Sequence, residues 1–145
     1  MLLLIPGPVQ TRPEVRAAMA QDIAPWDRDF QAVYARIRDR IVGVAGGTPG
    51  VHATLPIQGA RHFVTEAALR TFVPPGGKVL IPVNGAYASR MARLAREAGR
   101  EVVALDLPDT RGATAADILP ALEADPAISH VAFVFNETGS GIVND

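Results

Sequence analysis

Short apolar runs alternate with amphipathic helical patterns from about residue 51 onward, and this alternation constrains the fold more than any other feature. The run KVLIPV at 78–83 is continuously apolar, which is typical of a strand covered on both faces. Segment 85–99 carries its apolar residues on one helical stripe, and EVVALDL at 101–107 has a strand pattern again. Alternating strands and helices predict βαβ units, a mostly parallel sheet and right-handed crossovers.

The same alternation extends to both sides of this central unit. VHATLPI at 51–57 is predicted as the first strand and HVAFVF at 130–135 as the fourth. Between the last two strands, a helix is predicted from Thr114, because Asp117 stands at capping-box spacing from it. Pro120 leaves the middle of that helix open, since proline lacks the N–H that a helix interior needs.

Two helices are predicted ahead of the alternation. TRPEVRAAMA begins with Thr11 and Glu14 at capping-box spacing. A longer helix is predicted over 26–47. Its apolar residues lie on one face, its arginines and aspartates lie on the opposite face, and two glycines end it. These helices do not join the strands, so we predict an N-terminal arm over residues 1–47 and the first part of an α/β domain over 48–145.

Composition excludes several classes of partner. The formal net charge of the 145 residues is −1, which gives no global attraction to nucleic acid or to an anionic membrane. The apolar start MLLLI is too short for a signal peptide, and no apolar run approaches the roughly 20 residues of a membrane span. The chain has no cysteine and only three scattered histidines, which disfavours a metal site. We therefore expect a cytoplasmic protein without a metal.

Three polar segments follow predicted strands: QGARH at 58–62, NGAY at 84–87 and NETGSG at 136–141. In a parallel sheet, ligands bind at the carboxyl ends of the strands, so these segments are predicted to converge on one crevice. No third glycine and no helix follow the two glycines of NETGSG, which disfavours a nucleotide-binding domain.

Each segment has two interpretations on local grounds. QGARH opens a helix whose free N–H groups, with Arg61 and His62, favour an anion, but it equally suits a plain turn with an exposed arginine. Tyr87 is placed to stack on a flat ring or to pack in the core. Glu137 and Thr138 are placed to bind a ligand or to lie in a flexible loop.

Five segments occur in the order typical of one enzyme family. They are LLLIPGPVQTRPEVRAAM, WDRDF, QGARHFVTEAAL, KVLIPVNGAYASRM and ISHVAFVFNETGSGIVND. Together they resemble class V pyridoxal-phosphate aminotransferases of fold type I, and within them the 2-aminoethylphosphonate–pyruvate transaminases. The resemblance covers essentially the whole chain. It implies a partial fold-type-I large domain, a homodimer or other self-association, pyridoxal 5'-phosphate as cofactor, and an amino donor and pyruvate as substrates.

The resemblance also implies roles for individual residues. The turn holding Ala60, Arg61 and His62 corresponds to the cofactor-phosphate loop, Tyr87 to an aromatic on the pyridine ring, and Thr138 to a hydroxyl near the phenolic oxygen. Ala60 lacks the usual hydroxyl, and Arg61 stands where a glycine is usual. Arg61 could then either contact the phosphate or fill the space that a glycine leaves open. A further implied contact is a substrate-side loop near the dimer interface, formed by Pro6, Gly7 and Pro8.

Transamination also needs a Schiff-base lysine and a carboxylate on the pyridine nitrogen. The resemblance implies that both follow the matched segment, beyond residue 145. The only lysine here, Lys78, is predicted to be a solvated loop residue at the amino end of a strand, away from the crevice. We therefore expect this chain to be catalytically incomplete, as part of a transaminase, with uncovered apolar surface. The alternative is a non-catalytic interaction or small-anion-binding module derived from that fold.

Overall fold

A computed structural model describes residues 3–5 and 7–144, and it divides into two compact units. The first unit extends to Pro56 and the second begins at Ile57. No helix among the described residues is long and apolar enough to cross a membrane.

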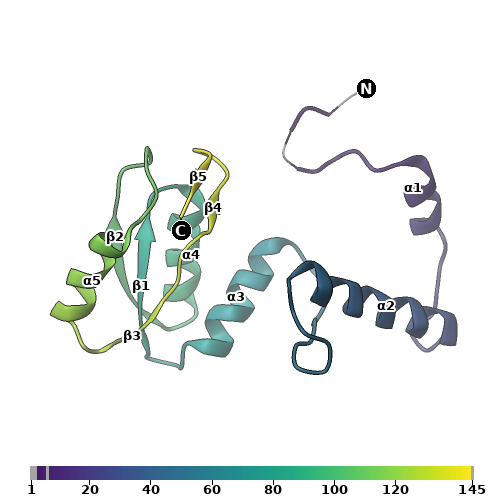
Figure 1. Cartoon of the computed structure of the whole chain (residues 1–145), viewed down its shortest axis with the longest axis horizontal. Helices are drawn as coiled ribbons and strands as arrows, with labels where there is room; N and C mark the ends of the chain where they lie inside the picture. The colour runs from purple at the N-terminus through teal and green to yellow at the C-terminus, as the bar shows by residue number, and fades with distance from the viewer. Residues whose placement is uncertain (1–2, 6, 145) are drawn as a thin grey trace. The chain divides into compact units, whose positions relative to one another are not determined.

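The first unit contains two helices, α1 (Pro13–Met19) and α2 (Arg28–Val44) (Figure 1). The predicted capping box of Thr11 with Glu14 is wrong, because α1 begins at Pro13 and its N-cap is Arg12, without a side-chain cap. The fixed φ angle of proline suits the first helical position, so proline sets the start of the helix one residue later than the hydroxyl requires. Helix α2 ends as predicted, just before Gly46, whose φ is +68°.

The second unit is built on a parallel sheet of β1 (Lys78–Val83), β2 (Glu101–Asp106) and β3 (Ile128–Val131), in the order β2-β1-β3. Strand β2 pairs with one edge of β1 and strand β3 with the other edge, so the two crossovers run in opposite directions. Right-handed crossovers therefore place α4 (Ala86–Glu97) and α5 (Ala115–Ala124) on opposite faces, as Figure 1 shows. Helix α3 (Arg61–Phe72) precedes the sheet and contacts α4.

The core lies between β1, α3 and α4. Val79, Leu80 and Ile81 of β1 are fully buried, which confirms a strand covered on both faces. Its Val79 and Ile81 side chains pack with the end of α3 and with Ala92 and Ala95 of α4. The small alanines allow α4 to approach the sheet closely.

The predicted first strand at 51–57 is wrong. In this segment the structure has a turn, one isolated bridge between Pro49 and His52, and no strand. A strand exists only where a neighbour accepts and donates its backbone hydrogen bonds, and no described segment pairs with residues 53–57. The last predicted strand also shifts: β3 covers 128–131, and the chain then leaves β1 and enters a short hairpin of β4 (Asn136–Glu137) and β5 (Ile142–Val143).

Helix α5 begins with the predicted capping box. The Asp117 carboxylate accepts hydrogen bonds from Thr114 N (2.9 Å) and Thr114 Oγ1 (2.7 Å). The same carboxylate accepts hydrogen bonds from both terminal nitrogens of Arg111, at 2.7 and 2.8 Å. The Arg111 hydrogen bonds, followed by those from Thr114, hold the pKa of Asp117 well below its usual range.

We expect this depressed pKa to make stability depend on pH. Asp117 favours the folded state above the carboxyl pKa of the unfolded chain, about 3.9, and this contribution is lost as the pH falls through and below that value. Asp117→Asn should therefore lower the urea midpoint at pH 6, and lower it by clearly less near pH 2, where the carboxyl of the unfolded chain is protonated. Asp109→Asn, at an exposed aspartate in the preceding loop, is the matched control. An equal loss at both pH values would contradict the assignment.

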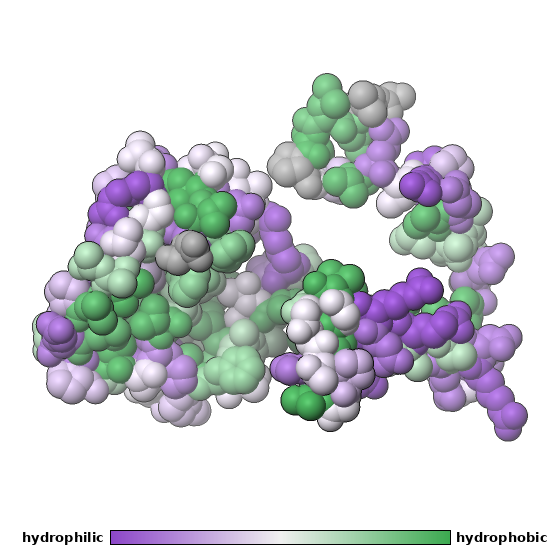
Figure 2. Space-filling view, viewed as in Figure 1, coloured by the Kyte–Doolittle hydropathy of each residue, from purple (hydrophilic) through white to green (hydrophobic). Residues whose placement is uncertain are grey.

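Large apolar side chains remain exposed in both units (Figure 2). In the second unit, Phe72 is 70% exposed and Phe135 is 62% exposed. In the first unit, the apolar face of α2 is largely open, with Ile37 and Ile41 nearly half exposed. These surfaces lack a covering layer among the described residues.

Candidate functional site

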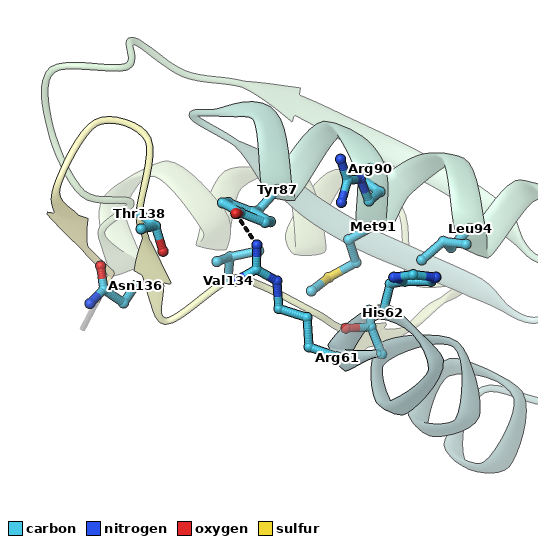
Figure 3. Close-up of a pocket in the computed structure, with 10 residues that line it drawn as sticks. Arg61, His62, Tyr87, Arg90, Met91, Leu94, Val134, Asn136 and Thr138 are labelled. Carbon is cyan, nitrogen blue, oxygen red and sulfur yellow. Dashed lines mark hydrogen bonds between the residues drawn. The ribbon is translucent and has the colours of Figure 1, made fainter. Parts of the chain in front are cut away.

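A cavity of about 250 Å³ lies where the starts of α3 and α4 meet the segment that follows β3 (Figure 3). Ligand pockets usually measure roughly 300–1,000 Å³, so this one suits a small ligand. The lining combines cationic, aromatic, hydroxyl, amide and apolar side chains: Arg61, His62, Thr65, Tyr87, Arg90, Met91, Leu94, Val134, Asn136 and Thr138. Among these lining residues there is no carboxylate, which favours a neutral or anionic ligand.

Local constraints fix the start of α3 beside the cavity. Gly59 has φ +132°, and a Cβ there would stand 2.6 Å from Cδ2 of Phe63. Only glycine therefore fits this turn. Ala60 is the N-cap and provides no side-chain hydrogen bond, so the first amides of α3 are not capped by a side chain.

Arg61 and Tyr87 contact each other across the cavity. The Arg61 guanidinium carbon lies 4.4 Å from the centroid of the Tyr87 ring, and Nη2 donates a hydrogen bond to the tyrosine hydroxyl (Figure 3). The guanidinium of Arg90 lies 5.7 Å from the same centroid. Tyr87 is therefore not part of the core cluster, although it lies on the apolar stripe of α4.

Glu137 is fully buried, but it does not face the cavity. Its carboxylate accepts hydrogen bonds from the backbone N–H of Tyr87, at 3.1 and 3.2 Å, and of Ala88, at 3.1 Å. It therefore caps α4 from a distant part of the chain, where a negative charge complements the helix dipole. A Cβ on Gly85 would lie 2.3 Å from Cγ and Cδ of Glu137, so glycine is required for this approach. The ligand-binding interpretation of Glu137 is wrong for this reason.

Two buried asparagines support the loops around the end of β1. Nδ2 of Asn84 donates to Oδ1 of Asn144 at 2.8 Å and to the Arg111 carbonyl at 3.1 Å. Asn144 in turn accepts from Ala113 N at 2.7 Å and donates to the Val134 carbonyl at 2.6 Å. This network ties the hairpin after β3 to the end of β1, and so holds Thr138 near α4.

Of the predicted cofactor residues, Arg61, His62, Tyr87 and Thr138 all line the cavity, whereas Ala60 does not. The predicted convergence of the three segments is therefore confirmed, while the binding roles stay predictions. Gly7 and Pro8 are exposed in the first unit, and Pro6 lies outside the described residues. Their predicted substrate role is untested.

Arg90 and Asn136 also line the cavity and were not predicted from the sequence. Arg90 lies three residues after Tyr87, and residues at this spacing share one face of a helix. Asn136 opens β4 and Thr138 directly follows it, one residue to either side of Glu137, and alternate residues of an extended chain point to the same side. Both spacings were available signals, and they explain why Glu137 faces away while its neighbours line the cavity.

Lys78 is the first residue of β1, at the amino end of the strand, as predicted. It is not a solvated loop residue, however. Nζ donates to Oδ2 of Asp125 at 2.9 Å and lies 3.5 Å from Glu101, and the side chain is only 25% exposed. The hydrogen bond from Lys78 to Asp125 raises the pKa of the lysine. Lys78 does not line the cavity.

A second, larger hollow of about 670 Å³ lies between α3 and the exposed side of β3. Its wall is almost entirely apolar and includes Val64, Ala68, Phe72, Val131 and Phe133. Arg61 lies at its border with the first cavity. This hollow offers hydrophobic contact and few polar groups to orient a small ligand.

Comparison with curated proteins confirms the predicted resemblance. Over 143 residues, or 99% of the chain, the sequence is 45% identical to 2-aminoethylphosphonate–pyruvate transaminase 2 of Burkholderia lata. It is 43% identical, over the same length, to 2-aminoethylphosphonate–pyruvate transaminase of Pseudomonas aeruginosa. The chain spans about 38% of the length of these relatives. No protein-family model matches it.

Comparison with solved structures confirms the predicted fold class. The TM-score is 0.86 with pyridoxamine–pyruvate aminotransferase from Mesorhizobium loti, at 22% identity, covering 99% of this chain and 36% of that one. It is also 0.86 with alanine–glyoxylate aminotransferase from Nostoc sp., at 26% identity, covering 97% and 37%. The fold is therefore α/β and corresponds to part of a fold-type-I aminotransferase.

Proposed function

We propose that this chain is the N-terminal part of a pyridoxal-phosphate-dependent transaminase of the 2-aminoethylphosphonate:pyruvate type. The observation that carries the proposal is the convergence of Arg61, Tyr87 and Thr138, from three separate segments, on one small cavity. The names of the similar proteins support the choice of an aminophosphonate as amino donor and of pyruvate as acceptor. A cytoplasmic location is expected with this function.

The side chains of the cavity fit the cofactor in charge and in the chemical groups they offer. Arg61, His62 and the uncapped start of α3 offer cationic and N–H groups to a phosphate. Tyr87 offers an aromatic ring, and Thr138 a hydroxyl for an oxygen on the ligand ring. When bound, pyridoxal phosphate supplies an electron sink for the chemistry at the amino carbon of the substrate. The described residues bind and orient the group, whereas Lys78 is held in ion pairs with Asp125 and Glu101 at the amino end of β1.

The second candidate is a small-anion-binding or interaction module without catalysis. Two guanidinium groups at the cavity, with no lining carboxylate, favour anion binding on their own. The apolar hollow beside β3 and the exposed Phe72 favour contact with another chain. Self-association, as a homodimer or a larger assembly, is the partner we expect in either case.

Titration with pyridoxal phosphate tests the proposal. We expect saturable binding, visible as an induced circular dichroism band in the cofactor absorption. Lys78→Arg removes the only side-chain amine that can react with the aldehyde, so binding that persists in this variant is not a reaction at Lys78. Sedimentation of the same samples at rising concentration measures self-association.

The outcomes separate the two candidates. Binding of inorganic phosphate but not of pyridoxal phosphate would favour the anion-binding module. Binding of neither, together with self-association, would favour the interaction module. A binding signal that disappears in Lys78→Arg would mean that the cofactor reacts at the wrong end of β1, which contradicts the proposed site.

A further inference from the structure

Arg61 covers the aromatic surface that a ring-shaped ligand would use. Its guanidinium lies 4.4 Å from the centroid of Tyr87 and is hydrogen-bonded to the tyrosine hydroxyl (Figure 3). We propose that Arg61 exchanges partners when the ligand binds: it leaves Tyr87 and pairs with the phosphate of the incoming ring. Arg61 then selects phosphorylated over unphosphorylated ligands. This inference rests on the proposed cofactor site.

The charge of Arg61 is available for such an exchange. Among the described residues it forms no ion pair, and its side chain is exposed. This differs from Arg111, which is paired with Asp117, and from Arg100, which is buried against carbonyl groups at the end of α3. The partners of Arg61 are a neutral hydroxyl and a ring face, so an anion that enters the cavity meets an uncompensated cation.

The exchange also agrees with the relative strength of the two contacts. An exposed cation–π contact is weak, whereas a guanidinium group forms strong two-point hydrogen bonds with phosphate. Arg61 is the first residue of α3, so its side chain starts from the helix end where the amides are not capped by a side chain. The guanidinium and the helix start can therefore act on the same anion, while the vacated face of Tyr87 receives the ring.

This arrangement distinguishes ligands by their phosphate. When a phosphorylated ring displaces Arg61 from Tyr87, its phosphate becomes the new hydrogen-bond partner of the guanidinium. An unphosphorylated ring of the same shape breaks the contact between Arg61 and Tyr87 but offers the guanidinium no anion in its place. The arginine is thus expected to penalise pyridoxal and to favour pyridoxal phosphate, although both carry the same aromatic group.

Dissociation constants for both ligands test the exchange, with Lys78→Arg as the parent chain. In Arg61→Gln, which removes the charge but keeps a long side chain, pyridoxal phosphate should bind about tenfold or more weakly, the size expected for one lost hydrogen bond to a charged group. Pyridoxal should bind equally well or more tightly. Arg61→Lys should recover part of the phosphate preference.

Two further variants keep the outcome interpretable. Tyr87→Phe removes the hydroxyl that holds Arg61 but keeps the ring, so pyridoxal phosphate should bind at least as tightly as in the parent chain. Arg93→Gln removes an exposed arginine of α4 that pairs with Glu97 outside the cavity, and it should change neither constant.

Two results would overturn the inference. In the first, the parent chain binds pyridoxal phosphate and Arg61→Gln leaves the affinity unchanged. In the second, Arg61→Gln lowers the affinity for pyridoxal phosphate and for pyridoxal equally. In the first case Arg61 is irrelevant, and in the second it only supports the cavity wall; the proposed function survives either. A parent chain that binds neither ligand overturns the proposed function and this inference with it.

Discussion

Replacing Glu137 by alanine is expected to lower the free energy of unfolding by roughly 3 kcal/mol, because two hydrogen bonds to a buried charged acceptor are lost together. The substitution leaves the N–H groups of Tyr87 and Ala88 without their acceptor at a site that excludes water. It also removes the negative charge from the start of α4. Urea unfolding followed by far-ultraviolet circular dichroism measures the loss.

Glu137→Gln is the matched control for this effect. It keeps the volume and a carbonyl oxygen for the two N–H groups, and it removes only the charge. We expect about half of the loss seen with alanine, since charged hydrogen bonds are roughly twice as strong as neutral ones. If both variants were as stable as the parent chain, Glu137 would not be the cap of α4.

Glu137→Gln should also weaken ligand binding at the candidate site. The backbone of Tyr87 is held by Glu137, and its ring and hydroxyl are in contact with Arg61. Loosening the start of α4 therefore displaces one wall of the cavity. A weaker affinity for pyridoxal phosphate in Glu137→Gln, at temperatures where the chain is fully folded, would show this coupling between the hairpin and the site.

Replacing Ile81 by alanine is expected to destabilise the second unit by about 2–5 kcal/mol, the usual range for truncating a buried isoleucine. Ile81 is 0% exposed and packs against Ala92 and Ala95 of α4. These neighbours are too short to fill the space that the substitution opens, so we expect a value in the upper half of that range. The free energy of unfolding from urea titration gives the number.

Ile81→Val removes one methylene group at the same position and serves as the graded control. Its expected cost is about 0.5–1.5 kcal/mol, because most of the contact is kept. Phe72→Ala, at an exposed position of α3, should change stability less than Ile81→Ala, although a larger side chain is removed. The reverse order would mean that the core does not lie between β1 and α4.

Elements with a strong local signal were predicted closely. The apolar run 78–83 is β1, the stripe in 85–99 is α4, and 101–107 contains β2. Periodicity suffices here, because each pattern matches one secondary structure and each element has its neighbour within the chain. NGAY follows β1 directly and lies at the carboxyl edge of the sheet, as this pattern predicts. QGARH and NETGSG also reach the cavity, but the structure has no strand before QGARH and places NETGSG in the hairpin of β4 and β5.

The segment 51–57 shows where a local pattern is insufficient. Its alternation suits a strand, but the backbone groups of a strand need a neighbour, and no described segment provides one. Strand formation depends on a segment and on the neighbour that pairs with it, whereas the alternation of apolar residues describes the segment alone. The shorter β3 has the same cause, because the strand ends where its pairing with β1 ends.

The sequence by itself determined β1, α4, β2 and α5 in their order, and the parallel sheet that the strands build, because periodicity and turn residues act over a few positions. Only the tertiary structure decided what the charged groups contact. Glu137 caps α4 from 50 residues away, Lys78 pairs with Asp125 across 47 residues, and Arg61 contacts Tyr87 across 26. Such pairings depend on how the crossovers place distant residues, and a side chain takes whichever partner lies within hydrogen-bond reach once the core has packed.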